Sequence, residues 1–347
     1  MTFLAGFEEA GAELRDGMDH VRVGLIGCGG FQRHRVGNLL KVADARIAAL
    51  ADTSDDQMAM MAGAHPVTAD LPRYHDYREM LERTEVDAVM IATPHTQHVD
   101  QIVHCLDHGV HTLCEKPMVT SVPDAHRVIA ARDKSGKQAM VSYQRHFQSE
   151  FRYIRDKILS GEAGEVTYIS ALQCQGWKKG TAGTWRQDPA LSGGGQLNDS
   201  GSHLVDIMLW ITGLQAASVS AVIDNRGTAV DIDSALSIRF RNGALGSITV
   251  VGDAPKWHED ITIWCKRMMF AIRQDHGLMV QYTDGDRFRA EHLMGGTTAD
   301  QNFIDAIQGR GKVESPFECG LEVIRLTEAA WKSAASGGNA VSVDSLG

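Results

Sequence analysis

The chain has 347 residues, of which 43% are hydrophobic and 22% charged, and its formal net charge is −10. This length predicts two domains rather than one core. The acidic balance, without a block of Lys and Arg, argues against nucleic acid or an anionic membrane as a partner, because both require concentrated positive charge.

Residues 1–19 have the composition of a polar extension and lack the apolar core of a secretory signal. No apolar run is long enough to span a bilayer. The six cysteines are scattered, without a C-x-x-C pair, which indicates reduced thiols in a reducing compartment. We therefore expect a cytoplasmic protein.

From residue 20 onward, short apolar runs alternate with helical stretches, which is typical of a parallel α/β sheet. The segment 88–92 is apolar without a break, as expected for a strand covered by helices on both faces. A first domain is therefore predicted at residues 20–145. Its strands are expected at 21–26, 46–51, 87–92, 110–114 and 138–142, and its helices at 31–42, 54–63, 76–83, 96–108 and 122–135.

The pattern changes in the second domain, predicted at residues 146–347. Alternation at period two dominates from about 215 to 283, and Asn242-Gly243 is a hairpin signal. An open, largely antiparallel mixed sheet is predicted. Its other elements are a linking helix at 149–159, a strand at 166–173 and helices at 196–210, 300–308 and 318–333, the last a candidate to pack back on the first domain.

The loop Gly27-Cys28-Gly29 follows the first strand and opens the first helix, which is the context of a dinucleotide-binding loop. Gly27 permits the tight turn, and Gly29 lets backbone N–H groups approach a pyrophosphate at the helix N-terminus. The third position of this fingerprint, normally small, is Gln32. Asp52 ends the second strand, where a carboxylate can bind the ribose hydroxyls; capping of the next helix is the alternative.

Two further carboxylates, Asp55 and Asp56, follow Asp52, and no Arg or Lys stands near it in sequence. A 2′-phosphate would be repelled there. NAD is therefore favoured over NADP.

Lys116 follows the strand at 110–114, within Glu115-Lys116-Pro117. Ligands of open α/β sheets bind beyond the carboxyl ends of the strands. A partly desolvated lysine beside a nicotinamide could shuttle a proton. The alternative is a surface lysine paired with Glu115.

Asp199 and His203 are four residues apart at the start of the predicted helix 196–210, so their side chains should share a face. A carboxylate beside an imidazole fixes its tautomer and stabilises the imidazolium. Asp206 is an alternative partner for His203, and helix capping an alternative role for Asp199. The preceding run 193–195 is all glycine, a cost in backbone entropy that is easiest to understand if another group approaches the loop closely.

A metal site is not expected. His104 and His108 are four residues apart with Cys105 between them, but they lie on a predicted covering helix without a suitably placed carboxylate. A solvated helix face is the better interpretation.

Taken together, these motifs resemble the Gfo/Idh/MocA family (glucose–fructose oxidoreductase, inositol dehydrogenase, rhizopine catabolism). The resemblance implies an N-terminal Rossmann domain with a doubly wound parallel sheet, followed by an α/β domain with an open mixed sheet. It implies NAD(P)-dependent oxidation or reduction of a sugar, polyol or related carbohydrate. Family members commonly pair through the exposed sheet face, so a homodimer or homotetramer is expected. The matching stretches are Ile26–Gly30, Ile91–Pro94 with His98, Glu115–Pro117, and the spaced Gly, Leu, Asp and His residues from Gly193 to Asp206.

The resemblance also implies roles for individual residues. Lys116 would contact the reacting hydroxyl, and His203, with Asp199, would accept its proton while hydride passes to nicotinamide C4; which of Lys116 and His203 is the main base stays open. The cofactor would contact Gly27, Gly29, Gly30, Phe31, Gln32, Asp52, Thr93, Pro94, His98, Glu115 and Lys116. The substrate would contact Lys116, Asp199, His203, Arg145, Trp185 and Arg186, with domain-interface packing as the alternative for the last three.

Two features depart from the family pattern. Gln32 replaces a small residue, so the first helix is expected to pack less closely on the sheet. Residues 264–268 occupy a region where relatives often have a glycine-rich hairpin. Besides a dehydrogenase, two readings stay open: an enzyme that oxidises a sugar transiently so that elimination can break a bond, and a non-catalytic dinucleotide-bound regulator.

Overall fold

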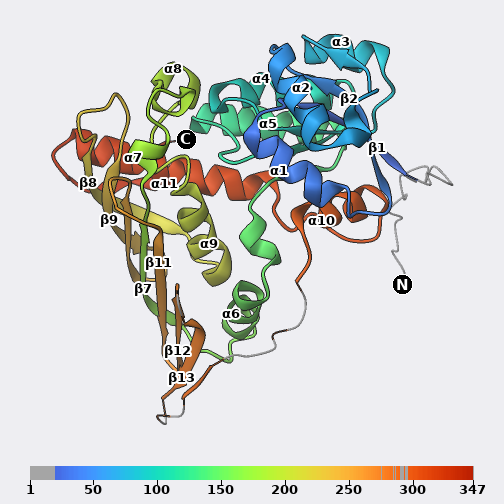
Figure 1. Ribbon diagram of the computed structural model, residues 1–347. Helices are drawn as coiled ribbons and strands as arrows, with labels where there is room; N and C mark the ends of the chain where they lie inside the picture. Colours follow the sequence, from blue (N-terminus) through green and yellow to red (C-terminus); the bar gives the residue numbers. More distant parts are fainter. Residues whose placement is uncertain are drawn as a thin grey trace, which may run out of the picture.

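Two β-sheets organise the chain in the computed structural model, which describes residues 20–274, 276–283, 285, 287–289, 293 and 296–346 (Figure 1). The extension predicted at residues 1–19 lies outside the described residues. Within the described part of the chain, no helix has the length and apolar character needed to cross a membrane.

The first sheet has six strands in the order β3-β2-β1-β4-β5-β6, and every neighbouring pair is parallel. The order reverses between β1 and β4, which creates the crevice where ligands of such sheets bind. The predicted doubly wound parallel sheet is confirmed. Its strands are β1 (Val21–Ile26), β2 (Ala45–Ala51), β3 (Arg73–Tyr74), β4 (Ala88–Ile91), β5 (His111–Cys114) and β6 (Ala139–Val141), and its helices are α1 (Gly30–Leu39), α2 (Asp55–Ala64), α3 (Tyr77–Arg83), α4 (His98–Asp107) and α5 (Val122–Ser135).

In the first domain, two predicted helices differ from the structure by more than a residue at one end or by a division. Helix α1 ends at Leu39 and not at 42, because the N–H groups of Lys41 and Val42 bond to carbonyls three residues back and tighten the chain. The helix predicted at 96–108 is divided into a short 3₁₀ helix, η2 (His95–Gln97), and α4.

The second sheet has nine strands in the order β14-β13-β12-β11-β7-β10-β9-β8-β15. All pairs are antiparallel except β7 with β10, so the predicted mixed, largely antiparallel sheet is confirmed. The strands are β7 (Val166–Cys174), β8 (Ala216–Asp224), β9 (Asp233–Phe240), β10 (Leu245–Val251), β11 (His258–Cys265), β12 (Met268–Arg273), β13 (Gly277–Tyr282), β14 (Arg287–Arg289) and β15 (Val341–Ser342).

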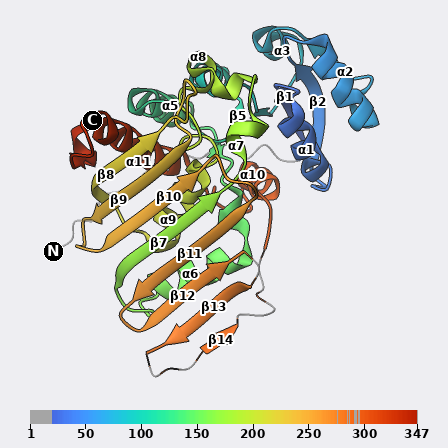
Figure 2. The same ribbon diagram turned by 60° about the vertical axis from the view of Figure 1, so that its left-hand side comes forward.

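One face of this sheet is open, as Figure 2 shows, whereas helices cover the other. Helices α9 (Ser202–Thr212) and α11 (Phe317–Ala335) pack on the covered face, and α6 (Ser149–Leu159) packs on α9. Buried and exposed residues alternate along β9, because helices cover only one face of the sheet.

The end of the chain returns to the first sheet. Helix α10 (Ala299–Ile307) packs on α1, and α11 contacts α5 and β6 as well as β8. Phe303 and Ile304 of α10 are buried in the same apolar cluster as Val23 and Leu25 of β1. The C-terminal helices therefore complete the core of the nucleotide-binding half.

The helix predicted at 196–210 begins only at Ser202, and residues 196–201 form turns. In these turns the N–H of Gly201 bonds to Gln196 O, five residues back instead of four. The carboxylate of Asp231 accepts the N–H groups of Gly195 and Leu197 at 2.8 and 2.7 Å, so a residue distant in sequence anchors this segment. Asp199 lies before the helix that carries His203, so the prediction that the two share a helical face was wrong.

The three glycines before these turns are each approached by another segment. A Cβ at Gly193 would overlap Thr120, one at Gly194 would lie 2.6 Å from Trp331 Cζ2, and one at Gly195 would overlap the main chain of Asp231. The close approach expected for this run is confirmed, and the approaching groups are the chain's own. The loop is clamped between the two halves of the molecule.

We expect Gly195→Ala to destabilise the protein by about 2–4 kcal/mol, because the added methyl group meets rigid backbone. Gly180→Ala, where a Cβ has nothing within 4 Å, is the matched control and should change stability by less than about 0.5 kcal/mol. Thermal unfolding of both variants measures the difference. Equal melting temperatures would contradict the clamp.

Candidate active site

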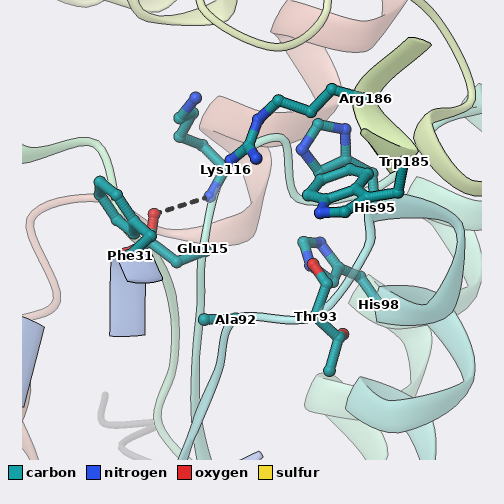
Figure 3. A pocket seen from close by; sticks show the side chains of 9 residues that line it. All are labelled: Phe31, Ala92, Thr93, His95, His98, Glu115, Lys116, Trp185 and Arg186. Atoms are coloured by element: carbon teal, nitrogen blue, oxygen red, sulfur yellow. Dashed lines mark hydrogen bonds between the residues drawn. The ribbon is translucent and has the colours of Figure 1, made fainter. Parts of the chain in front are cut away.

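A pocket lies at the carboxyl edge of the first sheet, where the second half of the chain faces it (Figure 3). It is built from the start of α1, the loop after β4, the end of β5 and the 3₁₀ helix η4 (Trp185–Gln187). Its lining residues are Phe31, Ala92, Thr93, His95, His98, Glu115, Lys116, Trp185 and Arg186.

Asp199 binds the cations at this pocket. Lys116 Nζ donates to Asp199 Oδ1 at 2.8 Å and to its main-chain oxygen at 3.0 Å. Trp177 Nε1 and Arg186 Nε both donate to Oδ2 at 3.0 Å. Burial opposes ionisation of this carboxyl, but the nearby Lys116, His95 and Arg186 outweigh it and hold its pKa well below the usual range. Asp199 is therefore an ionised carboxylate that joins the two halves.

Lys116 is not a surface lysine paired with Glu115, the alternative raised above. Its side chain is only 11% exposed and its ammonium group is paired with Asp199. Glu115 instead accepts the main-chain N–H of Lys116 at 3.3 Å, the dashed line in Figure 3. The peptide bond between Lys116 and Pro117 is cis.

Glu115 belongs to a second buried network, centred on Arg35 of α1. Arg35 Nη1 lies 2.9 Å from Glu115 and Nη2 lies 2.9 Å from Asp300 of α10, and Arg35 also contacts Ser142. Burial raises the pKa of Glu115, although Arg35 and Lys116 oppose the shift. Sequence reasoning missed Arg35. The available signal was its position among Gln32, Val36 and Leu39 on the buried face of α1.

His203 has neither of its predicted partners. Asp206 bonds to His146 at 2.9 Å, and Asp199 bonds to Lys116, Trp177 and Arg186. Among the described residues nothing bonds to the buried His203 Nδ1. Burial, followed by the charges of Lys116 and Arg145, holds the pKa of His203 well below its ordinary value, so the ring is neutral. Its role as a proton acceptor stays a prediction.

Arg145 is placed differently from Trp185 and Arg186. These two line the pocket, whereas Arg145 lies in a neighbouring buried cluster and pairs with Glu259 at 2.6 Å. Nη1 of Arg145 has no partner among the described residues. Substrate contact for all three stays a prediction, with the pocket geometry supporting Trp185 and Arg186.

Two histidines that follow the loop after β4 line the pocket, His95 at the start of η2 and His98 at the start of α4. His98 has Nδ1 2.9 Å from Pro117 O and Nε2 3.0 Å from Thr93 O, so it ties the loop after β4 to the segment after β5. His95 was missed by sequence reasoning, although it stands between Pro94 and His98 in a loop already singled out. Its ring is edge-on to Trp185, with centroids 4.7 Å apart.

The glycine loop fits a dinucleotide. Gly27 has φ 85°, which favours glycine, and a Cβ at Gly29 would meet nothing within 4 Å, so space lies open above the start of α1. No side chain caps that helix, and its first turn has no acidic residue. The first N–H groups of α1 are thus available to a pyrophosphate.

Asp52 holds this loop in place. It accepts the Cys28 N–H at 2.6 Å through Oδ2 and the Ser54 N–H at 2.9 Å through Oδ1. Ser54, not Asp52, is the N-cap of α2, so the capping alternative is wrong. Contact of Asp52 with a ribose stays a prediction.

The side chain of Gln32 is 1% exposed and donates to Met90 O at 3.2 Å, so it bridges α1 and β4. The looser packing expected for this helix stays a prediction. The expectation about cations near Asp52 is corrected. A cation stands near Asp52: Arg33 Nη1 donates to Cys28 O at 2.7 Å and Gln57 Oε1 at 2.8 Å. The sequence hid it because Arg33 reaches this loop from the neighbouring helix.

Known proteins match both halves of the chain. Residues 21–143 match the family model described as "Oxidoreductase family, NAD-binding Rossmann fold", and residues 151–271 the "GFO/IDH/MocA C-terminal domain". Rhizopine catabolism protein MocA of Rhizobium meliloti is 30% identical over 56% of this chain and 58% of its own length. Myo-inositol 2-dehydrogenase of Thermotoga maritima is 26% identical over 66% of this chain and 67% of its own length. The matched region therefore spans about three fifths to two thirds of these relatives.

Solved structures share the fold over nearly the whole chain. The WlbA dehydrogenase from Bordetella pertussis in complex with NADH and UDP-GlcNAcA superposes with a TM-score of 0.82 at 24% identity, covering 93% of this chain and 97% of that one. Levoglucosan dehydrogenase in complex with NADH superposes with a TM-score of 0.82 at 20% sequence identity, and the match covers 93% of this chain and 99% of that one. At these identities the similarity establishes the fold alone.

We expect Arg35→Met to destabilise the protein by about 3–5 kcal/mol at pH 7, because Glu115 and Asp300 lose their buried counterion. The stability that the variant loses relative to the wild type should become smaller as the pH falls. Glu115 already has a raised pKa, and without Arg35 it binds its proton at a higher pH in the folded than in the unfolded chain, so acid favours the folded state.

The measurement is thermal unfolding at about pH 7.5 and about pH 5.5. Arg83→Met, which breaks an exposed pair with Glu79, is the control and should cost less than about 0.5 kcal/mol. A deficit of Arg35→Met that is constant or grows in acid would rule out this account of the network.

Proposed function

The chain belongs to the Gfo/Idh/MocA oxidoreductase family, and on that premise we propose that it is a dehydrogenase that uses NAD to oxidise a hydroxyl of a sugar, polyol or related carbohydrate. The observation that carries the proposal is the buried Lys116–Asp199 pair at the carboxyl edge of the nucleotide-binding sheet. The ammonium group of Lys116, held at this position, would contact a substrate that is bound beside the nicotinamide.

The cofactor would be held by the glycine loop and the edge of the first sheet. Backbone N–H groups at Gly29, Gly30 and Phe31 would bind the pyrophosphate, and Asp52 would face the adenosine ribose. Thr93, Pro94 and His98 would border the nicotinamide. When bound, NAD supplies the hydride acceptor.

Lys116 would orient the reacting hydroxyl. Two of its three N–H groups are directed at Asp199, through Oδ1 and the main-chain oxygen, so a third is available to a substrate oxygen. Trp177 and Arg186 fix the other carboxylate oxygen, which keeps the lysine in place. As the C–H hydrogen leaves as hydride, the hydroxyl proton would pass to the neutral ring of His203; Lys116 would take this proton only as a neutral amine, after giving up a proton of its own.

The predicted homodimer or homotetramer is part of this proposal, as is the predicted cytoplasmic location. Trp264, Tyr168 and Leu245 stand in register on adjacent strands of the open sheet face and are 48%, 38% and 44% exposed. A contiguous row of large apolar side chains supports association through that face.

We expect Lys116→Ala and His203→Ala each to lower kcat by about 10²–10⁴-fold while NAD affinity survives, because both changes lie at the reacting end of the cofactor. NADH formation is followed by absorbance with a panel of sugars, inositols and sugar acids, and NADH binding by fluorescence. Lys134→Ala, an exposed lysine paired with Asp107, is the control.

Wild-type turnover in either variant would sink the assigned roles. Net conversion of a sugar without NADH accumulation would point instead to transient oxidation followed by elimination.

We expect the wild type to prefer NAD, and Asp52→Asn to improve kcat/KM for NADP relative to NAD by about tenfold or more. The amide keeps an acceptor for the Cys28 N–H but removes the charge that repels a 2′-phosphate, and Arg33 remains nearby. Asp133→Asn, which removes an exposed carboxylate of α5, is the control and should leave the ratio unchanged. Equal use of both cofactors by the wild type would contradict the assigned preference.

A further inference from the structure

His95 is the pocket residue whose chemistry the proposed function leaves unused. It is 4% exposed, lines the pocket beside Lys116, Trp185 and Arg186, and follows the loop after β4 (Figure 3). Its two ring nitrogens have different surroundings, and the difference determines what the ring can do.

The hydrogen of the His95 ring is on Nδ1. This atom lies 3.1 Å from the main-chain oxygen of Ser192, and a carbonyl oxygen can only accept. Burial lowers the pKa of His95 to about 3, so the ring carries one hydrogen at neutral pH. Nε2 therefore presents a lone pair.

That lone pair has no donor among the described residues. The carboxylate oxygen Asp199 Oδ1 lies 3.8 Å from Nε2, but it is itself an acceptor and already takes a hydrogen from Lys116. His98, at the start of α4, differs because its nitrogens lie 2.9 and 3.0 Å from main-chain oxygens, so neither is open to a ligand. Nε2 of His95 is thus an acceptor in the wall of the pocket without a protein donor. Because an unpaired buried acceptor costs free energy, a hydroxyl of a bound ligand that donates to it is stabilising.

We propose that His95 Nε2 accepts a hydrogen bond from a second hydroxyl of the substrate, adjacent to the one that Lys116 binds, so that the enzyme selects a vicinal diol. The inference rests on the proposed dehydrogenase function and names its substrate class. It makes His95 a substrate-binding residue that determines specificity.

The distances fit two neighbouring hydroxyls. Lys116 Nζ is 2.8 Å and His95 Nε2 is 3.8 Å from the same oxygen, Asp199 Oδ1, so the two nitrogens cannot be further apart than the sum of these distances. Hydroxyls on neighbouring carbons can each reach one of two nitrogens so placed at hydrogen-bonding distance. One nitrogen donates and the other accepts, which gives the two hydroxyls distinct roles.

The surroundings keep the His95 ring in this orientation. Ser192 O holds Nδ1, and the Trp185 ring meets the imidazole edge-on at 4.7 Å. Ser192 is the last residue of the short helix α8 (Pro189–Ser192) and directly precedes the clamped glycines, so the carbonyl that sets the tautomer is held in place. The acceptor is thus preorganised before the substrate arrives.

The test compares two variants of His95, one without and one with a hydrogen-bond acceptor near the position of Nε2. His95→Asn can keep a donor for Ser192 O but has no acceptor at the position of Nε2, whereas His95→Gln places an amide oxygen near it. The probes are myo-inositol against a deoxyinositol, and D-glucose against 2-deoxy-D-glucose. The readout is the ratio of kcat/KM for each parent over its deoxy analogue.

We expect the wild type to prefer a parent diol by about 100-fold or more, His95→Asn to reduce the preference at least tenfold, and His95→Gln to retain most of it. NADH binding by fluorescence and the melting temperature report whether each variant is folded.

An unchanged ratio in folded His95→Asn would overturn the inference while leaving the dehydrogenase function intact. So would a wild type that oxidises a deoxy analogue as efficiently as its parent, a result that needs no variant. A wild type that binds NADH but oxidises none of the probes, nor any member of the wider panel, would instead overturn the proposed function.

Discussion

The carboxylate of Asp199 is the interaction on which the rest of the site depends. It is buried, and a buried charge persists only when partners of opposite charge and hydrogen-bond donors surround it. Here the partners come from both halves of the chain: Lys116 from the end of β5, and Trp177 and Arg186 from segments beside the second sheet. One anion therefore sets the position of the candidate catalytic lysine and draws together the two walls of the pocket.

Asp199 lies in the turns before α9, and a second buried carboxylate anchors this segment. The carboxylate of Asp231 binds the N–H groups of Gly195 and Leu197, and Trp331 Nε1 donates to the same carboxylate at 3.1 Å. Gly193, Gly194 and Gly195 let Thr120, Trp331 and the main chain of Asp231 come close. The position of Asp199 opposite Lys116 is thus set together with contacts to residues that are distant in sequence.

The sequence predicted the two sheets well because their signals are local and periodic. The predicted helices at 122–135 and 149–159 have the bounds of α5 and α6, and the strand at 21–26 those of β1. The site was predicted less well where partners are distant. The spacing of Asp199 and His203 suggested a shared helix face, but the helix begins only at Ser202. Arg35 and His95 gave only weak local signals, because their partners Glu115, Asp300 and Ser192 are distant in sequence and meet them only in the folded chain.

The return of α10 to the first sheet bears on how the chain is made. Phe303 and Ile304 complete the apolar cluster around β1, and Asp300 neutralises Arg35, yet all three are synthesised more than 250 residues after that strand. On the ribosome, the nucleotide-binding half is left with an exposed apolar patch, and Arg35 has only one of its two carboxylate partners, until the last helices emerge. The half that holds the cofactor loop is thus not an independent folding unit: a gene fragment that ends after β6 encodes a domain whose apolar core lacks the residues of α10.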